Sequence, residues 1–157
     1  MKIPPSSLYL RGLRGGISCF LEHGVIMIYG AGIDIVEVQR MAGIIARRGT
    51  RFLERVFTPG EIAYCHKRAL PAMHYAARFA AKESLLKSLG IGLGMGLSLQ
   101  EIEVLSDQRG KPEVRLQGKA EGMLHRLGVS VAHLSLSHTR HSATAVVILE
   151  KAGPPHA

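Results

Sequence analysis

The spacing of hydrophobic positions changes several times between residue 26 and residue 150. Ile26 to Ile35 is rich in β-branched residues, which predicts a first strand. Gly30 and Gly32 mark points where the backbone of this strand must turn or lie close to another segment. Apolar residues then recur every three or four positions, which predicts a helix directly after the strand: Val38, Met41, Ile44 and Ile45.

Two more helices are predicted between Thr58 and Leu89. Thr58-Pro59-Gly60-Glu61 is typical of a helix start, because Thr caps, Pro fits the first turn and Glu follows three residues after Thr. This short helix should end near Arg68. The longest helical pattern runs from Pro71 to Leu89, with Gly90 placed to end it. Four glycines between Gly90 and Gly96 predict a loop.

The last third of the chain predicts two hairpins separated by a helix. Ile102 to Leu105 and Glu113 to Leu116 flank a polar turn, Asp107 to Lys111, which contains a glycine. The remaining segments are a helix, Lys119 to Leu127, closed by Gly128, and two strands, Val129 to Ser137 and Ser142 to Glu150, joined near Thr139-Arg140-His141. This order predicts an α+β fold with a mainly antiparallel sheet and a long central helix, since strict βαβ alternation is missing.

The length of 157 residues and the 46% hydrophobic content fit one domain, predicted over residues 27–151. Residues 1–26 show no sustained periodicity and are predicted to be a disordered leader or an over-long start, with an organelle transit peptide as the alternative. Residues 152–157 are predicted to be a tail. Cys19 and Cys65 form no CxxC pair, and no apolar run reaches the roughly 20 residues of a membrane span, so we expect a soluble cytoplasmic protein.

A formal net charge of +8 and a pI near 9.9 point to a polyanionic partner: nucleic acid, anionic lipid, a polyphosphate or an acidic protein. Positive charge is concentrated in residues 40–55, which carry five arginines and one glutamate; a solvated helix face is the alternative. A nucleic-acid-binding module is disfavoured, because aromatic residues make up only 5% of the chain and none interleaves with the basic stretch as a stacking platform.

Glu83 and Lys87 lie one turn apart in the longest predicted helix. Spacings of three and four residues place both on the stripe that also carries Ala76, Phe79 and Ala80, and a stripe of small apolar residues normally faces inward. The alternative is an exposed Glu-to-Lys pair, which is common on helices and contributes about 0.2–0.5 kcal/mol.

Asp34 is a second carboxylate in an apolar setting, between Ile33 and Ile35 in the first strand. Alternation puts it on the face opposite the two isoleucines. It is either the polar side of an edge strand or a metal ligand. Mg²⁺ is typically held by one or two carboxylates together with substrate phosphates and water, which Asp34 and Glu83 can supply.

Other common sites are not supported. His133 and His138 are five residues apart on an alternating strand and so point to opposite faces, and no cysteine lies near them, which disfavours zinc. The loop Gly90 to Gly96 lacks the P-loop pattern, and GxGxxG is absent.

Three segments of the chain form a recognisable set: Gly32-Ile33-Asp34-Ile35, the run from Phe79 to Gly90 (FAAKESLLKSLG), and Ser135-Leu136-Ser137-His138-Thr139. Together they resemble the successive signature blocks of bacterial holo-acyl-carrier-protein synthases, within the 4′-phosphopantetheinyl transferase superfamily. The resemblance spans about Met27 to Glu150, and three blocks in order across a whole domain are a specific signal.

The resemblance implies a set of site residues. Asp34 and Glu83 would hold Mg²⁺, and Lys87 would contact the pyrophosphate or help the proton transfer. Contacts with the phosphates of coenzyme A are implied for His138, Thr139, Arg78 and Lys82. Contacts with an acidic carrier protein are implied for Arg40, Arg47 and Arg48.

The implied reaction moves 4′-phosphopantetheine from coenzyme A to a serine of apo-acyl carrier protein and releases adenosine 3′,5′-bisphosphate, in support of fatty acid biosynthesis. The resemblance also implies a homotrimer with active sites at subunit interfaces. No general base is assigned: a metal-activated water and Asp34 acting through water are both open. A subunit that binds carrier protein without catalysis is the competing interpretation, although intact Asp34, Glu83 and Lys87 argue against it.

Overall fold

The computed structural model describes residues 26–92 and 96–153. The predicted leader, the centre of the glycine-rich loop and most of the predicted tail lie outside these ranges. The predicted α+β architecture is confirmed. Its elements are β1 (Ile26–Glu37), α1 (Val38–Val56), α2 (Pro59–His66), α3 (Pro71–Ser88), η1 (Leu99–Glu101), β2 (Ile102–Ser106), β3 (Pro112–Leu116), α4 (Gly118–Arg126), β4 (Val129–His138) and β5 (Ser142–Ala152).

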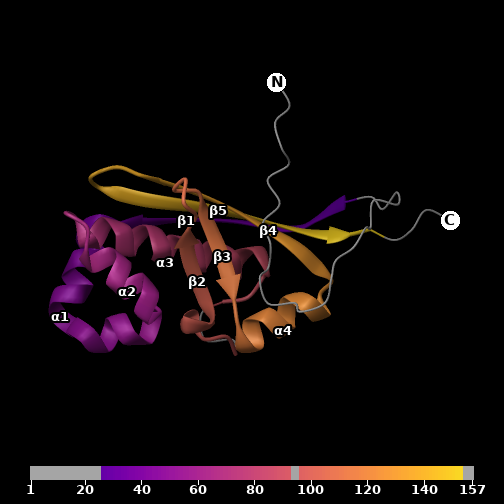
Figure 1. Cartoon of the computed structure of the whole chain (residues 1–157), viewed down its shortest axis with the longest axis horizontal. Helices are drawn as coiled ribbons and strands as arrows, with labels where there is room; N and C mark the ends of the chain where they lie inside the picture. Colours follow the sequence, from indigo (N-terminus) through magenta and orange to yellow (C-terminus); the bar gives the residue numbers. More distant parts are fainter. Residues whose placement is uncertain (1–25, 93–95, 154–157) are drawn as a thin grey trace, which may run out of the picture.

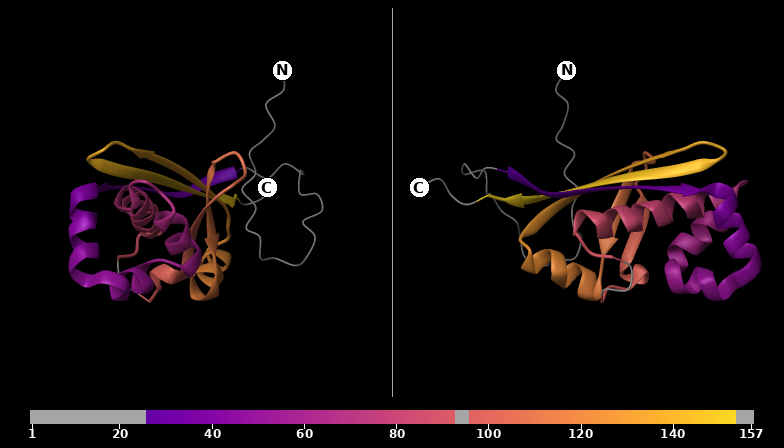
Figure 2. Two further views of the ribbon diagram at one scale, coloured as in Figure 1. Left: turned by 60° about the vertical axis from the view of Figure 1, so that its left-hand side comes forward. Right: turned by 180° about the vertical axis from the view of Figure 1, so that it is seen from behind.

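The strands form two antiparallel sheets. The larger sheet has the order β1-β5-β4, and β2 pairs with β3 in a separate hairpin. The helices and the small hairpin lie on one side of the larger sheet, while its other side carries no described element (Figures 1 and 2). The first and last described strands are therefore neighbours, with β5 at the centre of the sheet, β1 at one edge and Asp34 opposite Ala145.

Helix α3 lies directly on strands β1 and β5. Gly30 and Gly32 make this close packing possible, because a Cβ added at either position would lie 2.0 Å from the carbonyl oxygen of Ser88 or Ser84, respectively. The expectation that these glycines mark a close approach of the backbone is confirmed. The approach places the Asp34 end of β1 against the last two turns of α3.

Local signals explain most element boundaries. Thr58 and Glu61 form the predicted capping box at the start of α2. Gly90 and Gly128 have positive φ angles of 70° and 71° just after α3 and α4. Helix α1 extends beyond Ile45, the last residue of the predicted apolar pattern. It is broken at Gly49, whose φ of 54° suits glycine.

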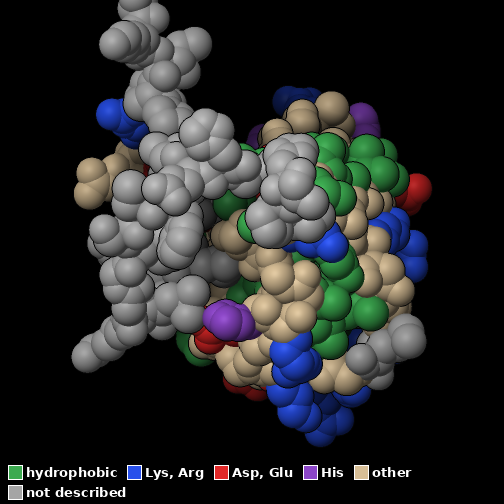
Figure 3. Space-filling view, turned by 90° about the vertical axis from the view of Figure 1, so that its right-hand side faces the viewer, with side chains coloured by type: hydrophobic (Ala, Val, Ile, Leu, Met, Phe, Trp, Pro, Cys, Tyr) green, Lys and Arg blue, Asp and Glu red, His purple; other side chains and the backbone are tan. Residues whose placement is uncertain are grey.

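The uncovered side of the larger sheet is apolar along β1. Ile28, Ile33 and Ile35 are 66%, 62% and 69% exposed, although large aliphatic side chains are usually buried. Figure 3 shows the end of the molecule at the right of Figure 1, where exposed hydrophobic side chains lie beside lysines and arginines.

No helix within the described residues is long and apolar enough to span a membrane.

Candidate active site

Asp34 and Lys87 meet where β1 passes over the end of α3. The Lys87 ammonium donates a hydrogen bond to Asp34 Oδ1 at 2.7 Å and a second to the carbonyl oxygen of Ile33 at 3.1 Å. The Asp34 side chain is 16% exposed, and that of Lys87 is 52% exposed. The two apolar neighbours of Asp34 point away from the helix, so the carboxylate faces α3 as strand alternation predicts.

Glu83 lies one turn before Lys87 and faces the same place. Its Oε1 atom is buried without a hydrogen-bond partner. Burial raises the pKa of Glu83, the negative charge of Asp34 raises it further, and the Lys87 ammonium opposes both effects. The two carboxylates are therefore close enough to repel each other, with one ammonium beside them.

This arrangement fits a hard divalent cation. A buried carboxylate oxygen without a partner, next to a second carboxylate, is an incomplete donor set that a cation would satisfy. No three His, Cys, Asp or Glu side chains converge within the described residues. A cation held by Asp34 and Glu83 would thus keep coordination positions for water and phosphate oxygens.

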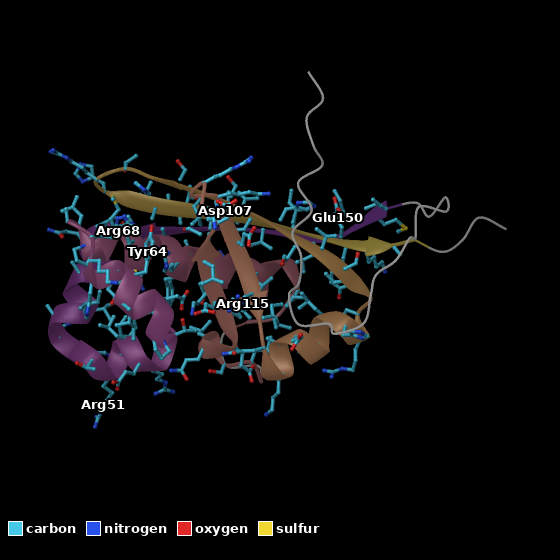
Figure 4. All side chains as sticks on the ribbon, in the orientation of Figure 1. Arg51, Tyr64, Arg68, Asp107, Arg115 and Glu150 are labelled. Carbon is cyan, nitrogen blue, oxygen red and sulfur yellow. The ribbon has the colours of Figure 1, made fainter. Side chains whose placement is uncertain are left out.

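A second group of polar residues gathers at the start of α3. The guanidinium groups of Arg78 and Arg68 lie 3.9 Å and 4.1 Å from the ring centroid of Tyr64, and Figure 4 shows Tyr64 and Arg68 side by side. The rings of His74 and His138 are 6.0 Å apart. Burial and the charges of both arginines lower the pKa of His74. The combination is a basic cluster suited to an anion.

Within this cluster Arg78 has unused hydrogen-bonding capacity. The residue is 3% exposed, yet its Nε atom is buried without a partner. Thr139, beside His138, lies in the β4–β5 turn, where its Oγ1 accepts hydrogen bonds from the backbone of His141 and Ser142 at 3.2 Å. Of this cluster, Arg78, His138 and Thr139 are predicted from the sequence. The other members, Tyr64, Arg68 and His74, are not, because they belong to no recognised block.

The carboxylates and the basic cluster do not form one pocket within the described chain. Asp34 lies on β1 and His138 on β4, with β5 between them. Along α3, Arg78 and Glu83 are five residues apart, which corresponds to about 7.5 Å of helix. The structure therefore brings Asp34, Glu83 and Lys87 together and leaves His138 on the opposite edge of the sheet.

Lys82 does not belong to either group, which corrects its selection as a phosphate contact. Its ammonium is fully buried and is paired with Glu61 Oε2 at 2.7 Å. It also donates to the carbonyl oxygens of Val56 and Leu99, each at 2.8 Å. All three donors are used inside the protein, so Lys82 joins α1, α2, α3 and η1 and has none left for a ligand.

Helix α1 presents a basic surface to solvent. Arg40, Arg47 and Arg48 are exposed, as are Arg51 and Arg55. Arg51 extends away from the body of the protein (Figure 4). The concentration of charge seen in the sequence is thus an accessible surface and not a set of internal ion pairs.

The comparison with known proteins agrees with this geometry. Residues 30–146 match the profile of the 4′-phosphopantetheinyl transferase superfamily. The chain belongs to this superfamily. The match covers most of β1 and all of α3 and β4, and so includes both carboxylates and the basic cluster. The family predicted from the three sequence blocks is confirmed.

Curated superfamily members are similar over nearly their whole length. The holo-[acyl-carrier-protein] synthase of Syntrophus aciditrophicus is 55% identical over 124 residues, which are 79% of this chain and 97% of that protein. The corresponding protein of Geobacter sp. is 47% identical and is covered completely.

Solved structures show the same transferase fold. The holo-[acyl-carrier-protein] synthase of Neisseria meningitidis superimposes with a TM-score of 0.75 at 34% identity, covering 80% of this chain and all of that one. The synthase of Bacillus anthracis, solved with CoA (3′,5′-ADP), has a TM-score of 0.67 at 35% identity, covering 80% and 99%. The transferase-like fold predicted from the sequence is thereby confirmed.

Proposed function

We propose that this protein is an Mg²⁺-dependent holo-acyl-carrier-protein synthase of the cytoplasm. It transfers 4′-phosphopantetheine from coenzyme A to a serine of apo-acyl carrier protein, in support of fatty acid biosynthesis. The observation that carries the proposal is the convergence of Asp34, Glu83 and Lys87, with one carboxylate oxygen buried and unpartnered, in a member of this superfamily.

The residues have separable roles in this reaction. Asp34 and Glu83 would hold Mg²⁺, which when bound supplies positive charge for the pyrophosphate of coenzyme A. Lys87, with a half-exposed side chain, adds a mobile positive charge on the same side. Phosphoryl-type transfer depends mainly on positioning and charge stabilisation, which these groups provide. The serine oxygen gives up its proton and attacks the phosphorus that bears pantetheine. The bond from this phosphorus to the bridging pyrophosphate oxygen breaks, and adenosine 3′,5′-bisphosphate leaves with that oxygen.

The basic cluster would take the phosphates remote from the metal. Arg78 has an unpartnered Nε and His138 is exposed, so these residues offer donors to an anion. Thr139 adjoins His138 and would have to turn its hydroxyl away from the Ser142 carbonyl oxygen to do the same. The exposed arginines of α1, including Arg40, Arg47 and Arg48, would receive the acidic carrier protein. Such a surface steers association and weakens with salt.

The proposal includes a homotrimer with active sites at subunit interfaces. Asp34 and His138 lie at opposite edges of one sheet, so a single chain presents two incomplete halves. A ring in which the β1 edge of one subunit meets the β4 edge of the next would complete three sites. The exposed isoleucines of β1 supply apolar surface for such a contact.

The proposal is tested by the mass of purified apo-acyl carrier protein after incubation with coenzyme A and Mg²⁺. The wild type should add one phosphopantetheine group, whereas Asp34→Ala and Glu83→Ala should lose at least about 10²-fold in rate. Leu70→Ala, which changes an exposed side chain away from both carboxylates, is the matched control. A folded wild type that modifies no carrier would refute the proposal.

Carrier docking has its own measurement. Replacing Arg40, Arg47 and Arg48 by Gln should raise KM for the carrier about 10-fold or more at low salt, with kcat and KM for coenzyme A little changed. The difference should shrink at 0.5 M salt, where the Debye length is about 4 Å. An unchanged KM for the carrier would place docking elsewhere.

A further inference from the structure

Lys87 occupies the position at which Asp34 would receive a metal ion. Its ammonium lies 2.7 Å from Asp34 Oδ1 and is held from a second side by the Ile33 carbonyl oxygen. Glu83 Oε1, close by, is buried and has no hydrogen-bond partner. The ammonium therefore pairs directly with one of the two carboxylates and acts on the other only at longer range.

We propose that Lys87 is an internal substitute for the metal, which holds Asp34 in the metal-free protein and must leave it when a divalent cation binds. This inference rests on the proposed function for the identity of the ion. Two features support the exchange. The Lys87 side chain is 52% exposed and can swing into solvent. The ammonium contacts one carboxylate only, so Glu83 is available to a cation before Lys87 departs.

The exchange has a measurable cost in affinity. A cation can use both carboxylates only in molecules whose Asp34 is not paired with Lys87. Its apparent dissociation constant is therefore the intrinsic constant divided by the fraction of such molecules. A partly exposed ion pair populated most of the time would raise the constant by about 3- to 10-fold. Removing the ammonium should therefore tighten binding of the cation, even though it removes a group that the reaction needs.

The exchange also gives Lys87 a second position. Once released from Asp34, its ammonium is free to contact a phosphate of the donor that binds at the same place. An anionic donor that attracts Lys87 thus makes Asp34 more available, and cation and donor should strengthen each other's binding by the same factor. Lys87 accordingly couples the two ligands as well as positioning them.

The test is binding of Mn²⁺ alone to the full chain, measured by electron paramagnetic resonance of the free ion at 0.1 M and 0.5 M NaCl. Lys87→Met should bind Mn²⁺ about 3- to 10-fold more tightly than the wild type at both salt concentrations, while losing transferase activity. Lys87→Arg, which keeps a cation beside Asp34, should stay close to the wild type. Asp34→Asn should bind weakly, and adding Lys87→Met to it should give little further gain.

The outcomes are distinct. Unchanged or weaker binding in Lys87→Met would overturn the proposal. A gain that disappears at 0.5 M NaCl would also overturn it, because general charge repulsion is screened by salt far more than displacement of a contacting group. Failure of the proposed function would appear separately, as a wild type that modifies no carrier protein whatever its affinity for Mn²⁺.

Discussion

Glu83 illustrates how a single residue can serve a site at the expense of the fold. Its carboxyl is partly buried beside a second carboxylate, and both conditions favour the protonated form and raise its pKa. At neutral pH the ionised group is therefore poorly accommodated until a cation binds. Strain of this kind is common at functional sites, where charge is arranged for a ligand and not for the empty protein.

We expect Glu83→Gln to stabilise the metal-free protein. A carboxyl whose pKa is higher in the folded state than in the unfolded state makes folding less favourable once the pH rises above the unfolded value. The thermal midpoint of Glu83→Gln in EDTA should thus exceed that of the wild type by about 1–3 °C at pH 7.5. The difference should fade as the pH falls below about 4, where the carboxyl becomes protonated in both states.

Calorimetry with added Mg²⁺ provides the internal comparison. Mg²⁺ should raise the midpoint of the wild type, since a ligand that binds only the folded state stabilises it. Glu83→Gln should respond far less. A variant that is less stable than the wild type in EDTA would show that the Glu83 carboxylate has partners that stabilise the fold.

The sequence pattern located Asp34, Glu83 and Lys87, because each is a charged residue in an apolar setting and falls in a recognisable block. It could not separate Lys82 from these residues. Lys82 is adjacent to Glu83 in sequence but turned by about 100° around the helix, and its partner Glu61 comes from another helix. Tertiary packing decides which basic side chain is paired inside the protein. The same is true of Arg78, which packs over Tyr64.

At the scale of elements, the distance between α3 and β1 determines whether the site can form. The two carboxylates come from different elements, and they meet only because the helix approaches the strand at two glycines. A Cβ at Gly32 would lie 2.0 Å from the Ser84 carbonyl oxygen and 2.7 Å from the Ser88 nitrogen, which are backbone atoms of the helix. Neither atom can move without displacing α3.

We expect Gly32→Ala to separate the helix from the strand. The free energy of unfolding should fall by about 2–3 kcal/mol, the cost typical of overpacking, and Mn²⁺ binding by the folded protein should weaken about 10-fold or more. Urea denaturation and titration with Mn²⁺ measure the two effects. Gly122→Ala in α4 is the control, because its Cβ would meet only the flexible end of Arg126 at 3.5 Å.

The control should gain up to about 1 kcal/mol from better helix propensity and bind Mn²⁺ normally. If Gly32→Ala lost stability but bound Mn²⁺ normally, the close approach would serve packing alone. Two glycines in one strand indicate such an approach, and this prediction from the sequence is confirmed. The break of α1 at Gly49 had no comparable signal, because one glycine among helix-forming residues is common in continuous helices.

At the scale of the whole molecule, the larger sheet is covered on one side only. Its covered side packs on α3 with fully buried Ala143, Ala145 and Val147. On its uncovered side, Ile33 and Ile35 of β1 are more than 60% exposed. Alternation predicted that these isoleucines would lie opposite Asp34, but not which face of the strand would be covered, since that depends on where α3 packs.

The exposed isoleucines lead to a prediction about assembly. An apolar sheet face without a cover is stabilised by association, and each fully buried aliphatic side chain contributes about 1.5–3 kcal/mol. We expect the wild type to have the mass of three chains in light scattering after size exclusion at micromolar concentration. Ile33→Asn should shift the population toward single chains without unfolding them, because the side chain is 62% exposed within one chain.

Leu70→Asn is the control for Ile33→Asn, because it removes a surface hydrophobic side chain outside the predicted interface. Leu70 is 56% exposed and belongs to no strand: it lies just before α3, in a pocket that Val38 and Arg140 also line, so this variant should keep the wild-type mass. If the wild type were monomeric and still active, Asp34 and the basic cluster would have to cooperate within one chain. The separation of β1 and β4 by a full strand argues against that. Activity should therefore depend on assembly, and the transferase activity of Ile33→Asn should fall in proportion to its trimeric fraction.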